Sequence, residues 1–464
     1  MAPTRRDFLR TSACALGGMA LASTMDNFGV VHALTPQAAT DYRALVCVFM
    51  NGGNDGNNTV VSLDQFNSYQ TARGVDLTIP QASLLPVSPS SGGSYGFHPN
   101  LIGLRDLFNL QKLAVITNVG PLVEPLTKTT YLNGTGKKPL QLFSHSDQVG
   151  LFQTAIANVV SQTGWSGRVA DKLVGLNGSS TFPQNISIAG INLLLTGVNT
   201  RQLAVADSNT SLANVLQLNM TGTNSEVASR TLAFNDLRNY DRNFTLIRAA
   251  SDTRTSAMQT DAALSNVNPI LTTVFPNTSI GRQLLQVARL IKASTDPAAG
   301  INMKRQIFFC QLGGFDTHSS QIAGQNTLLS QVSAAMRAFY DATVELGVAN
   351  NVTTFTLSDF GRTLQASGTL TQAGSDHGWG NHHFIMGGSV IGGRFYGTYP
   401  TLALGGPDDT DNAGGNARGR WIPTTSVEQY AATLASWYGL ASVDLPAVFP
   451  LIGRFSSPTL PFLI

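Results

Sequence analysis

Four short strand-like runs, most of them apolar and each ending in a polar segment with glycine in it or beside it, constrain the fold of this chain most. The runs have the length of buried strands rather than of helices. A segment with helical apolar spacing lies between the last two and ends at Gly347. Strand, loop, helix and strand in this order predict βαβ units, and therefore an α/β fold with a doubly wound, mainly parallel sheet flanked by helices. The predicted strands are residues 44–50, 112–120, 306–312 and 353–357.

The first 33 residues are predicted to lie outside this fold. Arg5 and Arg6 precede Phe8 and Leu9, a mildly apolar run follows, and "VHA" at 31–33 offers a small-x-small cleavage site. This pattern is typical of a secretory signal of the twin-arginine type, with an amphipathic N-terminal helix as the alternative. We expect export to the periplasm or beyond through the twin-arginine translocase. No later apolar run is long enough to span a membrane.

Residues 34–464 are predicted to form a single large domain, because their length suits one large α/β enzyme. Residues 175–300, rich in Asn, Ser and Thr and then helical, are predicted to form an inserted cap. The formal net charge of the whole chain is only +2 with no basic stripe, so nucleic acid is not expected as a partner. Cys47 and Cys310 lie inside predicted strands, which favours two core thiols over a disulfide.

Carboxylate, amide and imidazole side chains follow the predicted strands. In parallel sheets ligands bind at the carboxyl ends of strands, so we expect these side chains to meet at one edge. Oxygen and imidazole donors together suit zinc, manganese or iron. The alternative for the carboxylates is a structural role, such as a helix cap for Asp359 or a turn for Asp55. The candidates are Asn51, Asn54, Asp55, Asp316, His318, Asp359, Asp376 and His377.

A polar, glycine-rich loop at 405–421 carries three aspartates. Its spacing does not match an EF-hand, so a solvated loop is preferred to a calcium site.

Several motifs, taken in their order along the chain, resemble those of one known family. They are "MNGGNDGNNTV", "FHPNL", "FSHSDQ", "GWSGR", "GGFDTHSSQ", "LSDFGRT" and "GSDHGWGNHHFIMGG". The chain is identified by them as a member of the twin-arginine-exported family DUF1501, which belongs to the alkaline phosphatase and sulfatase clan. The resemblance runs from about residue 44 to residue 449. It implies an alkaline-phosphatase-like fold with metal ligands at strand ends.

The resemblance also implies roles for particular residues. The metal ligands would be Asn51 or Asp55, the pair Asp316 and His318, and then Asp359 and His377. The nucleophile would be Ser144 or Ser146, beside His145. The clan's Asp-x-x-x-His is shortened here to Asp-x-His, and its Asp-His dipeptide becomes Asp359-Phe360. A complete two-metal site is therefore not expected, whereas a single-metal site, or one rearranged around Asp376, His382 or His383, stays open.

Arg362, three residues after Asp359, is a candidate for binding a tetrahedral anion in a bidentate manner, with a structural salt bridge as the alternative. The sequence thus predicts an exported, metal-dependent hydrolase of phosphate or sulfate esters, whose substrate is a small molecule or a polymer. The alternative is a non-catalytic binding or envelope-assembly protein with a degenerate metal site. No CxxC, haem-attachment or dinucleotide motif supports a redox function.

Overall fold

A computed structural model describes residues 38–464, apart from 215–224, 240–244, 266 and 268. The predicted signal segment, residues 1–33, lies outside the described residues. Within them, no helix has both the length and the apolar character needed to cross a bilayer.

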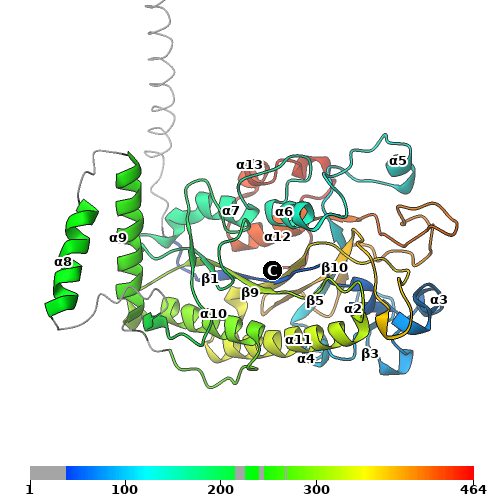
Figure 1. The fold of residues 1–464 in the computed structure, drawn as a ribbon, viewed down its shortest axis with the longest axis horizontal. Coiled ribbons are helices and arrows are strands. Elements are labelled where there is room, and N and C mark those ends of the chain that lie inside the picture. Colours follow the sequence, from blue (N-terminus) through cyan, green and yellow to red (C-terminus); the bar gives the residue numbers. More distant parts are fainter. Residues whose placement is uncertain (1–37, 215–224, 240–244, 266, 268) are drawn as a thin grey trace, which may run out of the picture.

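The centre of the molecule is a nine-stranded, mainly parallel sheet, as predicted (Figure 1). Its order is β11-β5-β10-β9-β1-β8-β6-β7, and β12 pairs with β5. Only β10 runs against its neighbours β5 and β9, so the four predicted strands all end at the same edge. The strands are β1 Arg43–Met50, β5 Leu113–Gly120, β6 Asn185–Ser187, β7 Gln202–Ala204, β8 Arg305–Leu312, β9 Val352–Ser358, β10 Asn381–Gly387, β11 Phe395–Tyr396 and β12 Thr425–Ser426.

Helices cover both faces of this sheet (Figure 1). Strand β1 shows the reason, because successive side chains of a strand point to opposite faces. Val46 and Val48 pack in a core cluster with residues of α4, α10 and α11, whereas Leu45 and Phe49 pack in a second cluster with residues of α7 and α12. The helices of the two layers are α4 Ile102–Asn109, α10 Ser279–Thr295, α11 Gln321–Glu345, α6 His145–Thr154, α7 Trp165–Leu173, α12 Val427–Tyr438 and α13 Leu445–Val448.

The two cysteines follow the same alternation. Cys47 lies in the cluster with α7 and α12, and Cys310 lies in the cluster on the other face. Both are buried and free. The prediction of two core thiols is confirmed.

Smaller elements complete the fold. A three-stranded antiparallel sheet of β2 Val60–Ser62, β4 Tyr95–Phe97 and β3 Leu85–Val87 lies beside the main one. The remaining α-helices of the described residues are α2 Gly56–Thr59, α3 Phe66–Leu77, α5 Lys128–Leu132, α8 Ser225–Asn239 and α9 Thr245–Ser265.

Residues 175–300 do not form one inserted unit, which corrects the predicted boundaries. Strand β6 pairs with β8 and with β7, so both strands extend the main sheet. Helix α10 belongs to the layer that contains α11. Only α8 and α9 project away from the sheet (Figure 1). The error has a physical source, because strands of three residues are too short to show a period of two.

Glu428, in the first turn of α12, is a buried acid and makes stability depend on pH. One oxygen accepts a hydrogen bond from the Leu451 amide at 3.2 Å, and the other has no hydrogen-bond partner. Burial raises the pKa of Glu428 to about 8, although the Leu451 hydrogen bond and Arg168 oppose the shift. A folded-state pKa above the unfolded value means that the folded state binds the proton more tightly. This stabilisation is complete below about pH 4.5 and is lost as the pH rises toward 8.

We therefore expect the Glu428→Gln variant to lose this dependence, because its amide is neutral at every pH. Urea unfolding at pH 5, 6, 7 and 8 measures the effect. The free energy of unfolding of the wild type should fall relative to that of the variant across this range. If the free energies of unfolding of the two proteins changed with pH in the same way, Glu428 would not be the source of the pH dependence.

Candidate metal centre

The exits of β8 and β9 bring together the segments that carry the predicted ligands. Asp359 directly follows β9, and Asp316 follows β8 after three irregular residues. Gly52, just after β1, lies between them: its amide donates to Asp359 Oδ1 at 2.9 Å. A Cβ on Gly52 would lie 2.4 Å from the Asp316 nitrogen, and its φ is +116°. Only glycine permits this close approach of the two backbones.

Three imidazoles converge on the carboxylate of Asp316. Its Oδ1 lies 3.1 Å from Nε2 of His318, 3.3 Å from Nε2 of His145 and 3.6 Å from Nε2 of His377. The ligand atoms of His145, Asp316 and His377 all lie within 4.8 Å of one another. His318 lies beside this group, with its Nε2 2.9 Å from Nε2 of His377, but it is not one of the three residues whose ligand atoms are all mutually close.

The Nδ1 atoms of the same rings face hydrogen-bond acceptors. His377 Nδ1 lies 2.7 Å from the Phe143 carbonyl, which can only accept, so this nitrogen carries the proton. His145 Nδ1 lies 2.8 Å from Asp359 Oδ2, and His318 Nδ1 lies 3.4 Å from Asp376 Oδ1. With the proton on Nδ1, the Nε2 lone pairs point toward Asp316. Metal-binding histidines are oriented in this way by carboxylates and carbonyls.

These residues fit a divalent metal ion. His145 Nε2 is buried and has no hydrogen-bond partner. The two facing Nε2 atoms of His318 and His377 would repel as lone pairs, unless a proton or a cation lies between them. Two ligands at roughly 2.1 Å from one ion, at about a right angle, are about 3 Å apart. Imidazole and carboxylate donors suit zinc, manganese or iron.

Electrostatics keep the donors in the protonation states that a metal needs. Burial alone would raise the pKa of Asp316, but its hydrogen bond and ion pair with Arg362 hold that pKa below the ordinary value. Burial lowers the pKa of His377, with the Phe143 carbonyl opposing it. Asp316 is therefore ionised and His377 neutral at pH 7.

Arg362 is not available to bind a substrate anion, contrary to the sequence-based hypothesis. Its side chain is fully buried, and its donors are used within the fold. They bond the carbonyls of Gly52 at 2.5 Å, Gly53 at 2.9 Å, and Phe315 and Ser375 at 3.1 Å, as well as Asp316. The carbonyls at the strand exits need these donors because the sheet ladder ends there.

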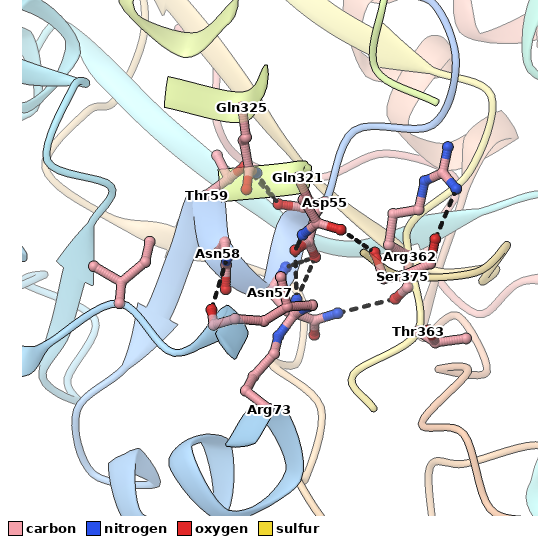
Figure 2. Close-up of polar contacts among 12 residues, drawn as sticks. Asp55, Asn57, Asn58, Thr59, Arg73, Gln321, Gln325, Arg362, Thr363 and Ser375 are labelled. Carbon is pink, nitrogen blue, oxygen red and sulfur yellow. Dashed lines mark hydrogen bonds and ion pairs between the residues drawn. The ribbon is translucent and has the colours of Figure 1, made fainter. Parts of the chain in front are cut away.

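Asp55 is not placed as a metal ligand either (Figure 2). It is the N-cap of α2, and its carboxylate forms a buried ion pair with Arg73 at 2.5 Å. Gln321 also donates to Asp55 and accepts from the Ser375 hydroxyl (Figure 2). The network thus lies beneath the loop that carries His377. The structural alternative considered for Asp55 is the observed one.

Asn51, the other candidate for the first ligand, bonds through its backbone. Its amide donates to Leu312 and its carbonyl accepts from Phe315, which ties the exit of β1 to that of β8.

The two candidate serines flank His145 at the start of α6. Ser144 donates to Asp147 at 2.5 Å, and Ser146 lies 3.4 Å from the same oxygen. His145 directs its ring nitrogens to Asp359 and Asp316, so it does not contact the serines as a base. Its Nε2 belongs instead to the group of ligand atoms around Asp316.

The other two histidines of this region lie in the core. His382 stacks on Tyr399 and accepts from the Asn118 amide, and His383 stacks on Tyr430. Burial lowers the pKa of each to about 3. Of the three residues considered for a rearranged site, only Asp376 lies near the centre.

The loop at 405–421 is part of the site's surroundings, which sequence reasoning missed. Asp409 is fully buried and accepts from four backbone amides, while Lys128 donates to the carbonyls of Gly405 and Gly406. The loop is therefore organised by internal hydrogen bonds. It presents Arg418 to Asp376, and Arg420 to the His377 carbonyl at 3.1 Å.

These features define a doubly wound α/β protein with imidazole and carboxylate donors gathered at the carboxyl edge of its sheet. The chain belongs to the DUF1501 family, described as a protein of unknown function, whose model matches residues 130–410. The family resemblance drawn from the motifs is confirmed. No curated protein matches the chain.

Solved structures with similarity to this chain include three of particular interest. One is a protein in the alkaline phosphatase superfamily from Vibrio parahaemolyticus, with 11% sequence identity and a TM-score of 0.35. The match covers 88% of this chain and 68% of that chain. The PsFucS1 sulfatase from Pseudoalteromonas has 10% sequence identity and a TM-score of 0.30, and the match covers 82% of this chain and 68% of that chain. The C-terminal periplasmic domain of EcEptC from Escherichia coli, in complex with Zn, has 10% identity and a TM-score of 0.33, covering 76% of each.

Proposed function

We propose that this protein is an exported, metal-dependent hydrolase of phosphate or sulfate esters. The observation that carries the proposal is the convergence of three imidazole Nε2 atoms and one carboxylate, with each Nδ1 facing an acceptor. The resemblance of the chain's motifs to those of DUF1501, a family that belongs to the alkaline phosphatase and sulfatase clan, supports the choice of ester. Export rests on the N-terminal twin-arginine pattern.

The ion, when bound by His145, Asp316 and His377 with His318 beside them, would supply Lewis-acid chemistry toward the ester oxygens. The chain's own residues orient the donors. Asp359 fixes the ring of His145, and the Phe143 carbonyl fixes that of His377. Arg362 keeps Asp316 ionised.

Two further groups serve the ester itself in this proposal. Arg420 lies beside His377 with a guanidinium that is only partly buried, so it favours an anionic substrate near the centre. Ser144 and Ser146 stay the candidate nucleophiles. Asp147, rather than His145, is placed to accept the proton of Ser144.

A second candidate function is a non-catalytic metal-binding protein. The observation that favours it is the structural use of Arg362 and Asp55, two residues that the hydrolase hypothesis assigned to substrate and metal.

One experiment separates the two candidates. The protein is purified from the exported fraction without chelators, its metal content is measured, and it is assayed on p-nitrophenyl phosphate, bis-p-nitrophenyl phosphate and p-nitrophenyl sulfate. We expect bound zinc, manganese or iron, and hydrolysis that a chelator stops and the His145→Ala variant lacks. Bound metal without hydrolysis of any ester would favour the non-catalytic function. No bound metal, and none taken up on addition, would refute both.

A further inference from the structure

Two carboxylates that resemble metal ligands in the sequence are fully committed to other groups. Asp359, almost completely buried, accepts from the Gly52 amide on Oδ1 at 2.9 Å and faces His145 Nδ1 with Oδ2 at 2.8 Å. Asp55 is paired with Arg73 and Gln321 (Figure 2). Among the described residues, one group of three or more metal-type side chains remains, and it is the group around Asp316.

A fixed cation already lies next to that group. Arg362 bonds Asp316 and also the carbonyl of Gly52, whose amide bonds Asp359. The guanidinium therefore lies between the exits of β1, β8 and β9. Phe360, which follows Asp359, packs under it, with 5.7 Å between the guanidinium carbon and the ring centroid. An aromatic ring and a guanidinium thus fill the space beside Asp359, and neither can ligate a cation.

We infer that the centre binds a single divalent ion, and that Arg362 is a built-in cation that balances the charge of Asp316 where a two-metal site would use a second ion. Asp359 is then a positioning residue for His145 and not a ligand. This inference rests on the metal centre of the proposed function and adds its stoichiometry and the role of each carboxylate.

Metal stoichiometry tests the inference directly. The purified full chain is stripped with a chelator, dialysed and titrated with Zn²⁺, and native mass spectrometry and calorimetry count the bound ions. We expect one tightly bound ion per chain. Two tight sites would overturn the inference while leaving a metal-dependent function intact. No tight site would instead refute the proposed function, so the two failures are distinguishable.

The Asp359→Asn variant provides a second, independent measurement. A positioning residue should leave one site in place and weaken its affinity roughly ten- to a hundredfold, as outer-shell partners do. If Asp359 were a ligand of a second ion, the stoichiometry would fall from two to one. Asp444→Asn, at a partly exposed surface ion pair with Lys172, is the matched control and should change neither quantity.

The Arg362→Lys variant tests whether Arg362 balances the charge of Asp316. Circular dichroism confirms that the variant is folded. A single ammonium keeps the charge and should keep one bound ion. Uptake of a second ion by this variant would overturn the charge-balancing role, because the charge beside Asp316 is unchanged. Should the variant not fold, the wild-type stoichiometry still decides the question.

Discussion

Under the proposed function, the His377→Ala variant is expected to lose the metal ion and, with it, any hydrolysis of phosphate or sulfate esters. His377 Nε2 lies within 4.8 Å of the ligand atoms of both His145 and Asp316, and its ring is held by the Phe143 carbonyl. Loss of a ligand should lower metal affinity by more than about a hundredfold, because even outer-shell partners contribute ten- to hundredfold. The variant leaves no buried charge unpaired, so the fold should persist.

Metal content and Zn²⁺ affinity, measured beside circular dichroism, check this expectation. His318→Ala is the graded comparison. Its ring is more exposed than that of His377, and its Nδ1 is 3.4 Å from Asp376, so its loss should cost less affinity. A His377→Ala protein that keeps one tightly bound ion would contradict the assigned centre.

The Arg73→Met variant is expected to have a much lower free energy of unfolding than the wild type. The Arg73–Asp55 pair is fully buried, with both side chains almost without solvent exposure. Removing one partner leaves an uncompensated charge in the interior, which costs about 3–5 kcal/mol of the free energy of unfolding. Denaturant unfolding followed by circular dichroism measures the difference.

The same substitution at Arg337 is the matched control. Arg337 pairs with Asp341 one helical turn away in α11, at 2.9 Å, and both side chains are more than a third exposed. Exposed pairs of this kind contribute about 0–1 kcal/mol. Equal losses at the two positions would show that the buried pair is not a distinct stabilising element.

Asp55→Asn, which keeps a capping side chain, should also keep the metal content unchanged.

The sheet could be predicted from the sequence because its central strands β1 and β8 carry long apolar stretches. Strands β1, β8 and β9 are buried on both faces, and such strands appear as continuous apolar runs. Their shared carboxyl edge then followed from the parallel arrangement. The position of the candidate site was predictable for the same reason. Asp316, His318 and His377 were named from the sequence and do lie together, whereas His145 was not named as a donor.

The membership of the site depends on pairings between distant residues. An aspartate after a strand looks the same in the sequence whether it faces an ion or a guanidinium, and Asp55 faces Arg73 across a buried contact. The burial of Asp409 depends on four backbone amides of its own loop, which composition does not indicate. His145 could have been recognised as a donor, because it lies in a motif that the resemblance had already placed at the site.

The reversed direction of β10 has a consequence for how this family can diversify. Because β10 runs antiparallel to β9, the long segment between them, which carries His377, leaves the sheet and returns to it at one edge. Such a segment is a hairpin connection, and lengthening it does not require any strand to move. Each doubling of a loop costs only about 0.6 kcal/mol of closure entropy. Insertions there could reshape the approach to the centre while the scaffold stays unchanged, so relatives are expected to differ in length at this point first.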